Sequence, residues 1–316
     1  MSEIMNIQLS KSKNLFTTKI NIIFLILLPI CIIAGSGLFN TLIILIDLIF
    51  ILELIKTRNN YILKDNNFHF LIIFFIYLIF NSLYIATAKD YPVKDYESIT
   101  RSIGFLRFII LAYAIHFYFT KYENKILKYW FLIFVVVTFD IIFEFIFGKN
   151  IFGFSGISGR ISSFKPDDLN IGGYYFGFIM ICLFYLRNSS KKFFIACSII
   201  FFITALLIGE RSNFLKIFSM YVLFVLFFSK MNIYKKIFIF LMIIVVIVNI
   251  IINNKGFKSK FYRHIFVPII QTYNENEHFN LNDIINRIEY FSLYNSAIRI
   301  FKENPTFGSG LKTFRY

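Results

Sequence analysis

Long apolar segments alternate with short polar segments over most of this chain. The apolar runs cover residues 20–39, 40–55, 68–88, 102–119, 127–147, 170–187, 192–209, 214–229 and 234–252. About 20 helical residues cross the roughly 30 Å hydrocarbon core of a bilayer, and most of these runs approach that length. The bilayer offers no water to backbone groups, so each crossing segment must be a helix. The pattern therefore predicts an all-α, polytopic transmembrane helix bundle with about nine spans.

The charge of the polar segments predicts the orientation of the bundle. Basic residues gather before the first run and after every second run, around 11–19, 56–64, 121–128, 187–192 and 230–236. Short basic loops remain in the cytoplasm, so these segments are predicted to lie inside. Residues 1–19 then form a cytoplasmic N-terminus and 20–252 the membrane bundle. Residues 253–316 form a long outer, periplasmic segment.

This outer segment contains one amphipathic pattern. Apolar residues recur at helical spacing from Asp283 to Glu303, which predicts a helix over 283–303. Asn304 and Pro305 follow and predict its end. Such a helix could lie on the membrane surface or across the mouth of the bundle.

Composition narrows the classes of protein that fit. Of the 316 residues, 58% are hydrophobic, which favours one membrane bundle over two soluble domains. The net charge of +15 would suggest nucleic acid in a soluble protein, but most of the bases mark predicted cytoplasmic loops. We therefore expect membrane lipids and no nucleic acid as partners. The 3 cysteines and 4 histidines show no metal-ligand spacing, so we expect no metal and no cofactor.

Several ionisable residues fall inside the apolar runs, where they are costly and often functional. Asp140 and Glu144 share one face of the fifth run, at a depth that arginines of the fourth run can reach. We predict ion pairs between these two runs, and a proton or ion relay is the alternative. The ionisable residues are Asp47, Glu53, Arg101, Arg107, Asp140 and Glu144.

Three arginines lie in segments predicted to be outside: Arg160, Arg211 and Arg287. A guanidinium keeps its charge and presents a planar fork of donors that matches phosphate oxygens. Each arginine could instead pair with a nearby acid, such as Glu210 beside Arg211 or Glu289 beside Arg287. Three arginines on one side favour an anionic ligand such as a lipid diphosphate.

The segments around these arginines resemble the O-antigen ligase and O-antigen polymerase superfamily of bacterial polysaccharide assembly. The loop Gly159-Arg160 to Phe164 is similar to the first outer arginine region of that family. Residues 206–212, LLIGERS, are similar to its T-x-S-R-S helix end, with glycine and glutamate in place of hydroxyl residues. Arg287 and the later NPTFGSG at 304–310 resemble its R…A…P-x-x-G-x-G block. The resemblance covers about 150–316.

The resemblance implies a membrane glycosyltransferase that moves a glycan from an undecaprenyl-diphosphate carrier to an acceptor sugar. The acceptor would be another lipid-linked glycan or lipid A-core. Arg160, Arg211 and Arg287 would bind the diphosphate, without a metal or cofactor, on the periplasmic face of the bacterial inner membrane. A catalytic histidine is expected beyond Tyr316, so the resemblance implies a C-terminally truncated chain or one of compromised activity.

A transporter or flippase of lipid-linked oligosaccharides is the alternative function. It would also use outer arginines to capture the diphosphate, but it needs no catalytic base. Transporters commonly show paired repeats and broken helices near the membrane midplane. The sequence shows neither feature, so the glycosyltransferase is the favoured interpretation.

Overall fold

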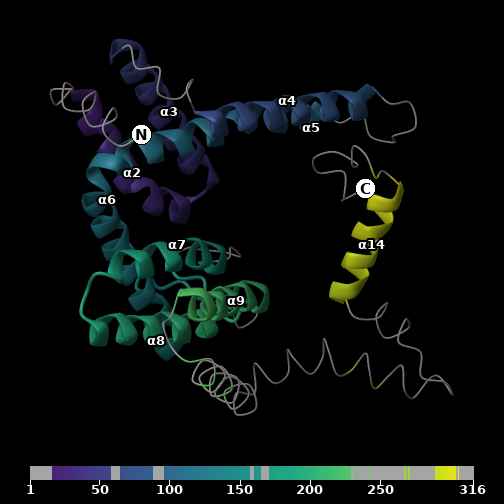
Figure 1. Ribbon diagram of the computed structural model, residues 1–316. Helices are drawn as coiled ribbons and strands as arrows, with labels where there is room; N and C mark the ends of the chain where they lie inside the picture. The colour runs from purple at the N-terminus through teal and green to yellow at the C-terminus, as the bar shows by residue number, and fades with distance from the viewer. Residues whose placement is uncertain are drawn as a thin grey trace. The chain divides into compact units, whose positions relative to one another are not determined.

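The computed structural model of the chain is built from helices (Figure 1). It describes residues 16–57, 65–87, 96–156, 160–164, 171–228 and 289–303 and a few isolated positions, and no strand occurs among them. The helices are α2 (Phe16–Ala34), α3 (Ser36–Thr57), α4 (Asn66–Thr87), α5 (Tyr96–Gly104), α6 (Leu106–Phe147), α7 (Ile171–Leu186), α8 (Lys191–Leu207), α9 (Arg211–Phe228) and α14 (Glu289–Glu303).

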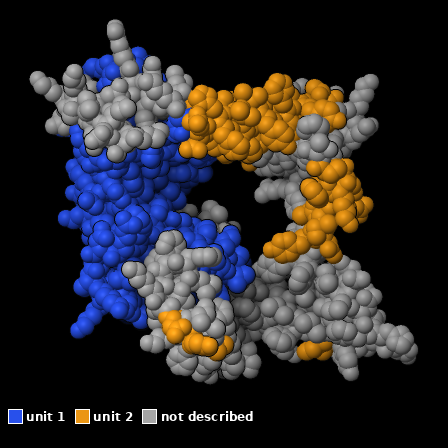
Figure 2. Space-filling model, in the orientation of Figure 1, with its two compact units in different colours: residues 1–65, 107–230 blue, residues 66–106, 231–316 orange. Residues whose placement is uncertain are grey.

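The chain divides into two compact units (Figure 2). The first consists of residues 1–65 and 107–230 and contains α2, α3, nearly all of α6, and α7 to α9. The second consists of residues 66–106 and 231–316 and contains α4, α5 and α14. All candidate site residues that the structure describes belong to the first unit.

Within the described residues, four helical segments are long and apolar enough to cross a membrane: Thr17–Ala34, Ser36–Thr57, Asn66–Tyr84 and Ser98–Phe147. Helix α7 is apolar but shorter, at 16 residues. Helices occupy the positions of the first eight predicted runs, whereas the run at 234–252 lies outside the described residues. The all-helical class is therefore confirmed for the described residues, and these helices are compatible with a membrane protein. The predicted number of about nine spans stays a prediction.

Helix α14 bears out the end of the amphipathic pattern. It runs from Glu289 to Glu303 and stops just before Asn304-Pro305, as predicted. The exposed Arg299 and Glu303, at i,i+4, form a salt bridge of 3.1 Å on it. The predicted beginning of this helix, residues 283–288, lies outside the described residues.

The turn between the first two helices lies earlier than the boundary between the apolar runs 20–39 and 40–55. Helix α2 ends at Ala34 and α3 begins at Ser36, so Gly35 alone makes the turn. Its φ of +129° is a conformation that residues with a Cβ rarely adopt. The backbone N–H of Gly35 donates to the Cys31 carbonyl, and its own carbonyl accepts from Phe39. Both bonds fasten the hairpin.

The inner loop expected at 120–128 is helical instead. Helix α6 continues through it with a kink at Tyr122, whose φ is −121° and ψ is 17°. No glycine or proline occurs from Phe105 to Phe147, and lysine, glutamate and leucine are good helix formers. The basic residues of this segment are therefore helical on both sides of a break at Tyr122.

A buried polar network joins α2, α3 and α6. The Glu53 carboxylate accepts from the Thr18 hydroxyl at 2.8 Å and from the Tyr118 hydroxyl at 2.5 Å. The Asn21 amide donates to the same Tyr118 oxygen at 2.9 Å and to the Ile46 carbonyl at 3.2 Å. Helices in lipid gain little from apolar association alone, so directional bonds such as these fix their register.

Aromatic side chains pack α6 against α7 and α8. The Phe134 ring centroid lies 4.6 Å from that of Tyr175 and 4.9 Å from that of Phe201. All three side chains are buried. Helix α9 packs on α7 and α8 in turn (Figure 1). This packing fixes the helix ends that carry the candidate site.

Trp130 donates a hydrogen bond to a backbone carbonyl of α2 that lacks its helical donor because of a proline. Pro29 lies inside α2 and has no N–H, so the Leu25 carbonyl four residues earlier loses its helical donor. The indole Nε1 of Trp130 on α6 donates to that carbonyl oxygen at 2.8 Å. A proline is tolerated in a membrane helix when a neighbouring helix supplies the missing partner.

Replacing Trp130 by phenylalanine should therefore destabilise the protein by about 1–3 kcal/mol, because the Leu25 carbonyl is left buried without a donor. Adding Pro29→Ala should recover much of this loss, since residue 29 then supplies its own N–H. The measurement is the loss of helical circular dichroism during titration with SDS in mixed micelles. Strictly additive effects of the two substitutions would contradict the assignment.

Candidate functional site

Two buried carboxylates near the C-terminal end of α6 organise the polar segment that follows. Asp140 is 0% exposed and Glu144 is 4% exposed. The helix ends at Phe147, and Gly148 follows with a φ of +75°, its N–H bonded to the Glu144 carbonyl at 2.8 Å. A left-handed glycine of this kind commonly ends a helix. The chain then folds back over the two carboxylates.

Glu144 binds three backbone N–H groups of this segment. One carboxylate oxygen, Oε1, accepts from the N–H groups of Gly156 at 2.9 Å and Ser162 at 3.1 Å. The other, Oε2, accepts from the N–H of Ser163 at 2.6 Å. Hydrogen bonds to an ionised carboxylate are stronger than those between neutral groups. Glu144 therefore holds Gly156, Ser162 and Ser163 against the helix.

Asp140 and Asn150 hold the same segment from a second side. Asp140 accepts from the Ile151 N–H at 2.9 Å and from the Ser163 hydroxyl at 2.7 Å. The Asn150 side-chain oxygen accepts from the N–H groups of Phe152 and Phe154, and its amide donates to the Ser163 carbonyl. All three polar groups of Ser163 are thus bonded, which maintains its unusual φ of 54°.

The predicted ion pair of Arg107 with Asp140 or Glu144 is wrong. Both acids bind backbone N–H and serine hydroxyl groups, and no described arginine of the same compact unit pairs with either. Arg101 belongs to the second unit, so its pairing stays a prediction. Arg107 instead lies close enough to Asp47 of α3 for electrostatic attraction. Neutral donors replace the predicted arginine because the chain after α6 returns over the carboxylates and brings its unpaired N–H groups with it.

The turn between α8 and α9 lies against the same segment. The N–H of Ile161 donates to the Ile208 carbonyl at 3.1 Å. Gly209 follows in a left-handed conformation with a φ of +77°, and α9 begins at Arg211. This backbone bond places Ile161, the residue after Arg160, against Ile208, which precedes Arg211 by three residues.

Glu210 lies in this turn and packs on α7. Its carboxylate accepts from the Asn213 amide, and its carbonyl accepts from the Phe214 N–H at 2.9 Å. A Cβ at Gly172 would overlap the Glu210 carboxylate and approach the Asn213 Nδ2 at 3.0 Å. Gly172 therefore permits the close contact between the beginnings of α7 and α9.

Two of the three candidate arginines come from segments in contact. The Arg160 side chain is exposed, next to the bonded Ile161. Arg211 is the first residue of α9, but the structure does not describe its side chain. Arg287 lies outside the described residues altogether, so the predicted convergence of all three arginines stays a prediction.

The described residues contain no group of three His, Cys, Asp or Glu side chains that could hold a metal ion. The cluster of Asp140, Glu144, Asn150 and Ser163 instead uses its polar atoms on one another and on the backbone. The cluster therefore supports the conformation of the loop, and the Arg160 side chain on this loop is exposed.

Sequence reasoning missed the residues that build this support. Asn150 and Ser163 are common loop residues and gave no distinct signal. Asn150 could have been noticed because it follows Gly148, the residue that ends the helix, by two positions. In such turns an asparagine side chain often accepts from the backbone N–H two residues later. Gly156 is needed because a Cβ there would overlap the Arg160 carbonyl.

Comparison with protein families, with curated proteins and with solved structures finds no match to this chain.

Replacing Glu144 by glutamine should release the loop, because an amide offers one acceptor oxygen where the carboxylate offers two. A lost partner for a buried N–H costs about 1–3 kcal/mol, so tryptic cleavage after the exposed Arg160 should become at least about fivefold faster. The measurement is limited proteolysis in detergent with mass-spectrometric mapping. Glu123→Gln, at an exposed position of the same helix, is the control. Equal cleavage of both variants would exclude the proposed support.

Two adjacent glycines of α7 provide a matched pair. A Cβ added at Gly173 would have no neighbouring atom within 4 Å, so Gly173→Ala should stabilise the helix by about 0.5–1 kcal/mol. Gly172→Ala should lack this gain and displace Glu210. Glu210→Ala should suppress the defect of Gly172→Ala but not alter the effect of Gly173→Ala. SDS titration measures the three single variants and the two double variants that contain Glu210→Ala. Equal stabilities for the two single glycine variants would refute the contact.

Proposed function

We propose that the chain belongs to a glycosyltransferase of the O-antigen ligase or polymerase type. It would transfer a glycan from an undecaprenyl-diphosphate carrier to an acceptor sugar on the periplasmic face of the inner membrane. The observation that carries the proposal is the hydrogen bond from Ile161 to Ile208. It joins the loop of Arg160 to the turn that leads into Arg211.

The reaction requires stabilisation of a leaving diphosphate. An acceptor hydroxyl attacks the anomeric carbon, and the bond from that carbon to the diphosphate oxygen breaks. Negative charge then grows on the diphosphate, where fixed cationic donors lower the barrier most. The hydroxyl proton passes to a base, for which the resemblance implies a histidine. Arginines suit the leaving group because their fork of donors binds two oxygens at once.

The location of Arg160 and Arg211 supports this role. Arg160 is exposed on a loop that Glu144 binds on both sides of it, at Gly156 and Ser163, so the loop is anchored while the guanidinium remains accessible. Arg211 is the first residue of α9, where a helix presents unpaired N–H groups and partial positive charge. Both features favour an anion beside this turn.

Arg211→Lys should impair transfer nearly as severely as Arg211→Ala, by at least about tenfold, because lysine keeps the charge but loses the bidentate fork. The assay follows glycan transfer from a purified lipid-diphosphate donor to the acceptor. Arg187→Lys, at an exposed position near the other end of α7, is the control and should retain activity.

Two outcomes would oppose the proposal. Full activity of Arg211→Lys at normal abundance would mean that charge alone suffices, as in a pair with Glu210. Movement of the lipid-linked glycan between leaflets without any transfer product would instead support the flippase. Reconstituted vesicles that contain donor on one side only distinguish movement from transfer.

A further inference from the structure

The kink of α6 lies between two apolar helical halves. The helix has 42 residues, which at 1.5 Å per residue give a length of about 63 Å. This is about twice the thickness of the hydrocarbon core, so one straight crossing cannot bury both halves. The charged segment around Tyr122 separates the halves and must lie at the boundary between membrane and water.

The bend at this boundary is sharp. The ring centroids of Phe119 and Trp130 are 5.4 Å apart, although residues so separated in a straight helix differ by about 16 Å along its axis. A cavity of about 320 Å³ opens at the bend, lined by residues Phe119 to Lys125.

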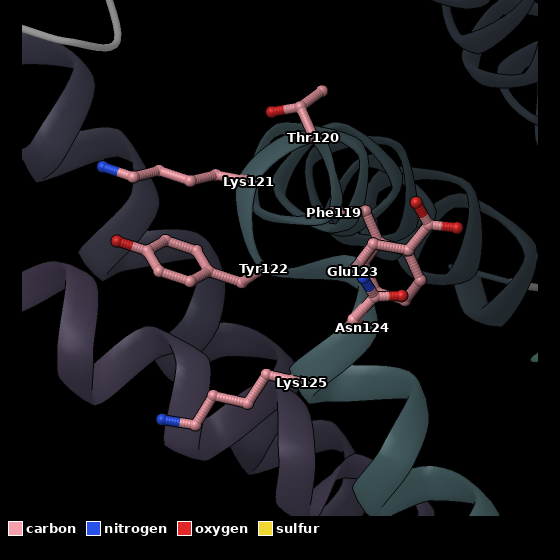
Figure 3. Close-up of a pocket in the computed structure, with 7 residues that line it drawn as sticks. All are labelled: Phe119, Thr120, Lys121, Tyr122, Glu123, Asn124 and Lys125. Carbon is pink, nitrogen blue, oxygen red and sulfur yellow. The ribbon is translucent and has the colours of Figure 1, made fainter.

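Two ammonium groups and a phenol extend to one side of this bend. Figure 3 shows Lys121, Tyr122 and Lys125 pointing in one direction, with Glu123 and Asn124 on the opposite side. The Lys121 Nζ lies 5.4 Å from the centroid of the Tyr122 ring. Among the described residues that line the cavity, Glu123 carries the one carboxylate, and it points away from the two ammonium groups. The side of Lys121 and Lys125 is therefore positively charged.

We propose that this cavity binds the phosphate of an anionic phospholipid. Two ammonium groups and one hydroxyl provide the donors that a phosphodiester needs. Exposed apolar side chains continue from the site along the second half of α6, including Tyr129 at 42% and Leu132 at 47% exposure. They provide a surface for the acyl chains, which a soluble phosphate would not use. This site is independent of the proposed glycosyl transfer.

The single tryptophan of the chain reports on this site directly. Trp130 contacts Phe119, which lines the cavity. The purified chain is reconstituted in phosphatidylcholine vesicles that contain a small, equal fraction of either brominated phosphatidylglycerol or brominated phosphatidylcholine. Bromine quenches indole fluorescence at short range, so the brominated phosphatidylglycerol should quench Trp130 more strongly.

Lys121→Gln combined with Lys125→Gln should abolish this excess quenching, with each lysine changing the apparent affinity about fivefold. Lys191→Gln combined with Lys192→Gln is the matched control. It removes the same charge from exposed positions of α8 and should leave the excess intact. Circular dichroism establishes that each variant is folded, and Lys121→Arg combined with Lys125→Arg should retain the excess.

Three results would overturn the proposal. The first is equal quenching of the wild type by both brominated lipids. The second is an excess that both glutamine variants lose equally, because surface charge in general would then attract the lipid. The third is loss of the excess on addition of inorganic phosphate but not of chloride at equal ionic strength, which would indicate a site for soluble phosphate.

Discussion

Polar groups inside an apolar bundle must find their partners within the protein, and this requirement governs the described structure. A buried acceptor without a donor costs several kcal/mol in hydrocarbon, on the order of the total gain from packing one side chain. Trp130 meets this requirement for the carbonyl that Pro29 leaves open, and Tyr118 and Thr18 meet it for Glu53. Apolar contacts bring the helices together, but these bonds select one register.

The same requirement explains why an arginine near two buried acids remains exposed. The Glu144 carboxylate already accepts three backbone N–H groups, so its charge is stabilised without a cationic partner. An arginine drawn into that position would give its donors to the acid and could not bind a ligand. Because neutral groups serve instead, Arg160 keeps its guanidinium at the surface.

The length and placement of the helices could be predicted because membrane thickness sets the length of an apolar run. Helix α7 covers 171–186 where 170–187 was predicted, and α8 covers 191–207 where 192–209 was predicted. The turns were predicted less well. A single glycine sufficed at Gly35, and the basic segment at 121–128 is helical except for the break at Tyr122. Charge marks a membrane boundary but does not by itself mark a loop.

The candidate site divides in the same way between what sequence can and cannot predict. Arg160 and Arg211 could be singled out by residue type, because a guanidinium presents a fork of donors that matches phosphate oxygens. Asn150 and Ser163 do not, because their importance lies in bonds to one another across 13 residues. Pro29 indicated that some donor was needed in α2, but only the folded chain identifies Trp130, 105 residues from the acceptor, as that donor.

The position of Glu144 adds a constraint that connects helix and loop. It lies in the last turn of α6, where the helix dipole disfavours a negative charge. The N–H groups of Gly156, Ser162 and Ser163 offset this repulsion, and the loop in turn depends on the charge for its conformation. Neither the buried carboxylate nor the loop conformation is therefore stable alone. Any change that releases the loop of Arg160 must also expose or neutralise Glu144.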